Sequence, residues 1–182
     1  MALAIVLAIR LTLPLTIIRS PFWGGLLAIA ADTVDILVFQ LLSFPDFITY
    51  HELDKVLDLY YLSLELIVAQ RWESLPRLVS SALFAYRLAG TVLFEFTGNR
   101  GILLFFPNVF ELFFLLHAYL QRYRPSRGLT AQSTATWLAV LIVPKLGQEY
   151  VLHSAKLLDD LVAVEVIRAA TASVVHWFGA RV

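Results

Sequence analysis

Four aspartates are the side chains in this sequence best placed to do chemistry together. Asp32 and Asp35 are three residues apart, and Asp54 and Asp58 are four apart. Each pair therefore lies on one face if its segment is helical. Clustered carboxylates bind a divalent cation, take up protons or pair with basic side chains. The basic candidates for such pairing are Arg10, Lys55 and Arg100.

Other ionisable residues stand inside apolar segments, where a charge usually faces the interior of a helix bundle and has a partner. Tyr61 and Glu65 continue the face of Asp54 and Asp58 at spacings of three and four. This spacing predicts one polar stripe along a helix. The remaining residues that we expect to be buried and polar are Arg10, Arg87, Glu95, Lys145 and Glu149.

The elements that must position these residues are long apolar segments. Six are close to the roughly 20 residues that a membrane-spanning helix needs. They cover residues 2–18, 22–42, 51–69, 75–96, 101–120 and 129–152. Residues 155–178 have a helical pattern but carry several charges, so they form either a seventh span or an amphipathic helix at the interface.

The composition agrees with this division. Of the 182 residues, 59% are hydrophobic and 15% are charged, whereas soluble domains have about 25% charged residues. Open sheets cannot cross lipid, and no alternating pattern typical of a barrel is present. We therefore predict an all-α, multi-pass transmembrane bundle that forms a single domain over residues 1–182.

Charge and cysteine content exclude several functions. Lys plus Arg and Asp plus Glu both number 14, and the resulting net charge of zero argues against nucleic-acid binding. The chain has no cysteine, so it has no thiolate nucleophile and no Cys-ligated metal site.

The two aspartate pairs are expected to meet in space. Asp32 and Asp35 lie in the second half of segment 22–42, whereas Asp54 and Asp58 lie in the first turns of segment 51–69. A short connector makes these segments antiparallel neighbours. The four carboxylates then meet near one membrane face, as a metal site or as a network of ion pairs.

Positive residues cluster near the loops on one side of the expected bundle. These residues are Arg19, Arg71, Arg77, Arg122, Arg124 and Arg127. Because such residues favour the cytoplasmic side, we expect the N-terminus to lie outside, in a prokaryotic cytoplasmic membrane.

The aspartate pattern resembles the signature of the CDP-alcohol phosphatidyltransferases, small helical membrane enzymes of phospholipid synthesis. Asp32-Thr33-Val34-Asp35 matches its opening pair and Asp54-Lys55-Val56-Leu57-Asp58 its closing pair. Arg10, Pro14 and Arg87 stand where that family often has an Arg, a Pro and a second Arg. The resemblance implies that Asp32, Asp35, Asp54 and Asp58 bind Mg²⁺ or Mn²⁺. It also implies that Asp58 is the catalytic general base that activates an alcohol.

The small residues of that signature are replaced here. Ile36 stands in place of a glycine, Phe39-Gln40 in place of Ala-Arg, and Tyr50 in place of the second glycine. The resemblance is therefore to a diverged family member, with or without catalytic activity.

Two other functions fit the same sequence. A small chain with polar helix stripes and no soluble domain suits a non-catalytic subunit of a membrane complex, whose partners are lipids and other subunits or a second copy of itself. Carboxylates in spans, with Pro14 and Pro144 interrupting helices, also suit an ion or proton transporter.

Overall fold

The computed structural model describes residues 2–42, 47–99, 101–126 and 128–149, and the side chains of residues 6–34, 56–99, 101–126 and 128–147. Within these ranges all regular structure is helical, as the sequence predicts. The predicted helix at 155–178 and the side chains of Asp35, Asp54 and Glu149 lie outside this description.

The helices follow each other with short connections. In chain order they are α1 (Ala2–Thr12), the 3₁₀ turn η1 (Leu13–Leu15), α2 (Thr16–Arg19), α3 (Pro21–Leu42), α4 (Phe47–Ala69), α5 (Ser74–Thr97), α6 (Gly101–Phe105), α7 (Val109–Tyr123) and α8 (Ala131–Glu149). The predicted segments 22–42 and 75–96 agree with α3 and α5 to within one residue at each end.

Proline explains the breaks in two of the predicted segments. Pro14 lies in η1, because a proline lacks the N–H that a continuing α-helix needs, and the first segment is split into α1 and α2 there. The predicted helix 101–120 is wrong as one continuous element. It divides into α6 and α7 around Pro107, and Asn108 is the residue that precedes α7.

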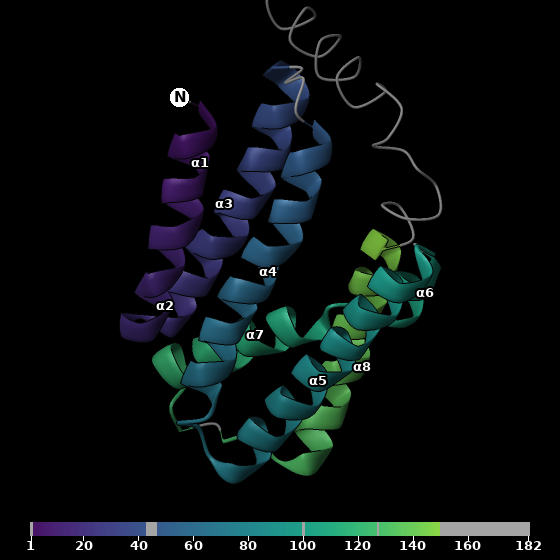
Figure 1. The fold of residues 1–182 in the computed structure, drawn as a ribbon. Helices are drawn as coiled ribbons and strands as arrows, with labels where there is room; N and C mark the ends of the chain where they lie inside the picture. Colours follow the sequence, from purple (N-terminus) through teal and green to yellow (C-terminus); the bar gives the residue numbers. More distant parts are fainter. Residues whose placement is uncertain (1, 43–46, 100, 127, 150–182) are drawn as a thin grey trace, which may run out of the picture.

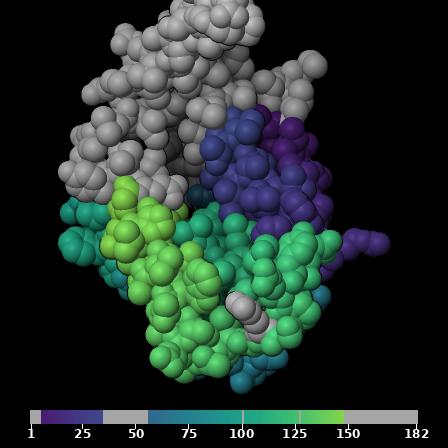
Figure 2. Space-filling model, turned by 180° about the vertical axis from the view of Figure 1, so that it is seen from behind, coloured from purple at the N-terminus to yellow at the C-terminus, as the bar shows by residue number. Residues whose placement is uncertain are grey.

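Helix α7 lies in the middle of the molecule. The helices α1, α3 and α4 run side by side, and α7 crosses between this group and the pair α5 and α8 (Figure 1). It contacts α3, α4, α5 and α8. The rear view shows the C-terminal part of α7 beside α3, with α8 next to it (Figure 2). A residue on α7 can therefore reach most of the other long helices.

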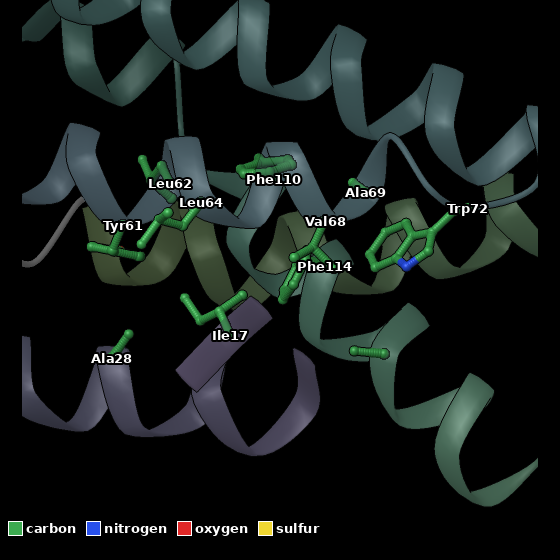
Figure 3. Close-up of a cluster of buried hydrophobic side chains, with 11 residues drawn as sticks. Ile17, Ala28, Tyr61, Leu62, Leu64, Val68, Ala69, Trp72, Phe110 and Phe114 are labelled. Carbon is green, nitrogen blue, oxygen red and sulfur yellow. The ribbon is translucent and has the colours of Figure 1, made fainter. Parts of the chain in front are cut away.

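The apolar core lies where α2, α3, α4 and α7 meet. Ile17, Phe110 and Phe114 have no exposed surface, and Val68 of α4 and Trp72, in the connection after α4, pack around them (Figure 3). Trp72 stacks on Phe114 with a ring-centroid distance of 5.1 Å. The close van der Waals contacts of this cluster fix α4 against α7.

Gly24 allows α3 to touch α2, and a substitution there tests the contact. A Cβ atom at Gly24 would overlap the backbone of Thr16 and Ile17, which cannot move aside as a side chain can. We expect Gly24→Ala to destabilise the protein by about 1–3 kcal/mol, measured by unfolding in detergent micelles.

Gly147 in α8 provides the matched control, because a Cβ there meets nothing within 4 Å. Gly147→Ala should stabilise the helix by about 0.5–1 kcal/mol. Equal effects of the two substitutions would contradict the close α2–α3 contact.

Two described stretches are long and apolar enough to cross a membrane, judged by length and composition. They are Ser74–Thr97, which is α5, and Gly101–Tyr123, which contains α6 and α7. Much of α5 is exposed, and Leu78 and Phe96 have exposed fractions of 68% and 86%. These stretches support a membrane protein, whereas the predicted number of six spans stays a prediction.

Candidate functional site

Arg10 joins two of the four predicted aspartates. Its Nη2 atom lies 2.6 Å from Asp32 Oδ1 and 2.6 Å from Asp58 Oδ1. Arg10 is buried, whereas the side chains of Asp32 and Asp58 are 24% and 38% exposed. We call these three residues the Arg10 centre. The carboxylates from α3 and α4 thus face each other across a single nitrogen atom, as the sequence predicts for these two members of the cluster.

Local structure explains how Arg10 reaches this position. Arg10 lies in the last turn of α1, directly before the break at Pro14, so α1 ends beside α3 and α4. Tyr60 of α4 donates a hydrogen bond to the carbonyl oxygen of Leu11 over 3.0 Å. This bond fixes the end of α1 next to Asp58 and holds Arg10 in place.

The other two predicted metal ligands belong to the same helices. Asp35 follows Asp32 by one turn in α3, and Asp54 precedes Asp58 by one turn in α4. The described residues contain no group of three or more His, Cys, Asp or Glu side chains that could hold a metal ion.

The Arg10 centre does not fit a divalent cation in the way the family resemblance implies. Carboxylate oxygens are suitable ligands for Mg²⁺ or Mn²⁺. Here, however, the guanidinium group lies within 2.6 Å of an oxygen from both Asp32 and Asp58. A metal ion would have to displace that cation from both carboxylates at once.

A second polar centre surrounds Glu111 of α7. Tyr61 donates a hydrogen bond from its hydroxyl to Glu111 Oε1 over 3.0 Å, and Asn108 Nδ2 donates to Oε2 over 3.1 Å. Lys145 Nζ of α8 lies 3.8 Å from Oε2. All four side chains are buried. We call them the Glu111 centre, and it joins α4, α7 and α8 through hydrogen bonds and one ion pair.

Glu65 is the most deeply buried acid among the described residues. It has no exposed surface, and neither carboxyl oxygen has a hydrogen-bond partner within the part of the chain that the structure describes. Gly25 of α3 faces it so closely that a Cβ atom there would lie 3.2 Å from Glu65 Oε1. Glu65 therefore lies at the junction of α3, α4 and α7.

The stripe predicted on α4 connects the two centres. Asp58 belongs to the Arg10 centre, Tyr61 to the Glu111 centre, and Glu65 follows four residues later. The side chain of Asp58 is 38% exposed, whereas Tyr61 is 4% exposed and Glu65 has no exposed surface. One face of α4 thus runs from the surface to the interior through three ionisable side chains.

The remaining predicted polar residues have different environments. Arg87 is half-buried and donates a hydrogen bond from Nη1 to the carbonyl oxygen of Phe106 over 3.0 Å, so it joins α5 to the break before α7. The prediction that Glu95 is buried is wrong. It is exposed and lies in the last turn of α5.

The sequence does not indicate which residues of different helices meet. Tyr61 and Glu65 were predicted to lie on one polar stripe, but the contact of Tyr61 with Glu111, 50 residues away in the chain, was not predicted. The available signal was the three-residue spacing of Asn108 and Glu111 at the start of a Phe-rich helix, which marks a polar spot on an otherwise apolar face.

Comparisons with known proteins do not add to this description. No family model matches the chain, and neither a curated protein nor a solved structure is significantly similar to it.

Proposed function

We propose that this chain is a multi-pass membrane protein that resembles the CDP-alcohol phosphatidyltransferases but is non-catalytic, with Arg10 in place of the divalent cation. One observation carries the proposal: a single nitrogen atom of Arg10 lies 2.6 Å from carboxylates of both α3 and α4. The guanidinium supplies the positive charge that otherwise a metal would supply to this acidic helix pair.

The sequence around the Arg10 centre supports the same proposal. The positions at which the family signature has glycine carry Ile36 and Tyr50. Bulky side chains there leave less room for a nucleotide to approach the helix backbones. The centre then acts as an internal ion pair that joins α1, α3 and α4. Charged side chains inside a membrane usually pair with one another in this way.

The outer surface supports a location in the membrane. Apolar side chains on α3, α5 and α8 point outward, among them Trp23, Leu78 and Val143, with exposed fractions of 47%, 68% and 71%. Water disfavours an apolar surface of this kind, whereas lipid chains or neighbouring membrane helices cover it. We propose that lipids and other membrane subunits are the partners of these faces.

A manganese titration tests the proposed loss of the metal site. Thermal unfolding of the purified protein in detergent should not change between millimolar Mn²⁺ and a chelator. In Arg10→Ala, the carboxylates of Asp32 and Asp58 lose the guanidinium between them. That variant should therefore gain stability on addition of Mn²⁺. Protection of the wild-type protein that Asp58→Asn removes would instead indicate a metal site of the catalytic kind.

Labelling of single cysteines tests the multi-pass topology, because the chain has no cysteine of its own. Figure 1 shows the α4–α5 and α7–α8 connections at the same end of the molecule. If α5 and the stretch 101–123 both span the membrane, Glu73→Cys and Ser126→Cys should react from one side and Asn99→Cys from the other. All three positions are exposed. Labelling of all three from the same side would contradict the proposed spans.

A further inference from the structure

Glu65 is a buried carboxyl group that belongs neither to the Arg10 centre nor to the Glu111 centre. It has no exposed surface, and its oxygens accept no hydrogen bond within the described residues. An ionised carboxylate in such a place is among the most unfavourable groups to bury, and uptake of a proton removes its charge. A purely structural side chain at this position would be apolar.

The walls around Glu65 leave little room for a ligand larger than a proton. The close approach of Gly25 brings the α3 backbone against the carboxyl group, and Phe114 and Leu115 of α7 pack against the same glycine. No group of metal-ligating side chains is present among the described residues. Oxygen ligands in the numbers that Mg²⁺ or Ca²⁺ needs are therefore not available from these walls.

Ionisable side chains lead along α4 from the surface to Glu65. Asp58, Tyr61 and Glu65 lie on one face of α4, and the exposure of their side chains decreases in that order. Tyr61 lies between Asp58 and Glu65 along this face and donates its hydroxyl hydrogen to Glu111, so its hydroxyl can exchange a proton with a buried carboxyl group. Chains of Asp, Glu and other proton-exchanging groups in spanning helices are typical of proton relays.

Several charged or titratable groups lie on the helices packed around α4. Among the described residues they include Arg10 on α1, Arg19 on α2, Asp32 on α3, Arg87 on α5, Glu111 and His117 on α7, and Lys145 on α8, whereas Arg77 and Glu95 of α5 and Arg122 of α7 are exposed. Arg10 binds Asp32 and Asp58, Lys145 lies beside Glu111, and Arg87 donates to a backbone carbonyl. Arg19 is exposed, and the ring of His117 packs against Trp72 and Phe113.

We propose that Glu65 binds a proton and is the inner station of a proton relay that runs along α4 from Asp58 through Tyr61. Asp58 takes a proton from water and passes it to the Tyr61 hydroxyl, which turns away from Glu111 and gives its own proton to the carboxylate of Glu65, and the reverse steps return the proton. No oxidant or second substrate takes part. The relay begins at Asp58 of the Arg10 centre, but its inner station, Glu65, has no part in that centre, so proton binding at Glu65 goes beyond the proposed phosphatidyltransferase-like function.

Infrared spectroscopy of the protein in lipid tests proton binding. A protonated carboxyl group gives a C=O stretching band that a carboxylate lacks. We expect this band in the wild-type protein at neutral pH, a shift of the band when glutamate is labelled with ¹³C, and its loss in Glu65→Gln. The labelling test does not depend on how well a variant folds. Absence of a glutamic-acid band, or an unchanged band in Glu65→Gln, would overturn the proposal.

Proton flux tests the relay. The protein is placed in vesicles that contain a pH-sensitive dye, and a potassium diffusion potential drives proton entry. We expect flux with the wild-type protein, a rate no higher than that of protein-free vesicles with Glu65→Gln, and unchanged flux with Glu73→Gln, an exposed glutamate between α4 and α5. Equal rates with wild type and Glu65→Gln would overturn the relay. Because Glu65→Gln leaves Arg10, Asp32 and Asp58 unchanged, the manganese titration reports separately on the proposed function.

Discussion

Lys145→Met is expected to lower the free energy of unfolding by about 3–5 kcal/mol, the cost of removing one partner from a buried ion pair. Lys145 and Glu111 are both buried, and Nζ lies 3.8 Å from Glu111 Oε2. Methionine keeps most of the volume and the apolar stem of the lysine. The loss therefore reports the charge beside Glu111, and unfolding in mixed micelles measures it.

Two further variants separate the ion pair from general effects of the substitution. Arg77→Met removes an exposed cation from α5 and should change stability by no more than about 0.5 kcal/mol. In the double variant Lys145→Met with Glu111→Gln, the acid is neutral and can still accept a hydrogen bond from Tyr61. This variant should recover much of the loss. A single Lys145→Met variant as stable as Arg77→Met would show that the pair contributes nothing.

Much of the local structure follows from short-range rules. The bounds of α3 and α5 were predictable because Pro21 suits a helix start and Gly98 adopts a left-handed conformation, with φ of 66°, after the last turn of α5. The break at Pro14 follows from its missing N–H. The division at Pro107 was missed, because the high content of phenylalanine on both sides suggested one uninterrupted span.

The Arg10 centre was predictable in part. Sequence spacing placed Asp32 and Asp58 on antiparallel neighbours, and Arg10 was one of three basic residues within reach as a partner. Spacing could not choose among those three residues. The choice depends on how the end of α1 is held against α4 by the hydrogen bond of Tyr60 to Leu11, which is a tertiary feature.

The Glu111 centre and the burial of Glu65 could not be derived from the sequence. They depend on α7 crossing the bundle against α3 and α4, and periodicity within one helix says nothing about which neighbours it meets. A polar stripe on α4 is visible in the sequence, but which of its members have a partner is decided by helices far away in the chain.

Arg10→Ala is the second substitution with a large expected effect. It should destabilise the protein by about 3 kcal/mol, the lower part of the range for a broken buried pair, because the carboxylates of Asp32 and Asp58 are partly exposed to solvent. Thermal unfolding in detergent without divalent cations measures it. The control is Arg19→Ala, which removes an exposed arginine from α2 and should change stability only slightly.

Three additional variants decide whether charge or packing causes the loss. If the guanidinium acts by balancing the two carboxylates, Arg10→Lys should keep part of the stability, because it keeps the charge but not the planar group. Asp58→Asn combined with Arg10→Ala should be more stable than Arg10→Ala alone, since one of the two acids is then neutral. If Arg10→Met is as stable as the wild type, the side chain acts by packing, and the proposal that Arg10 replaces a metal ion fails.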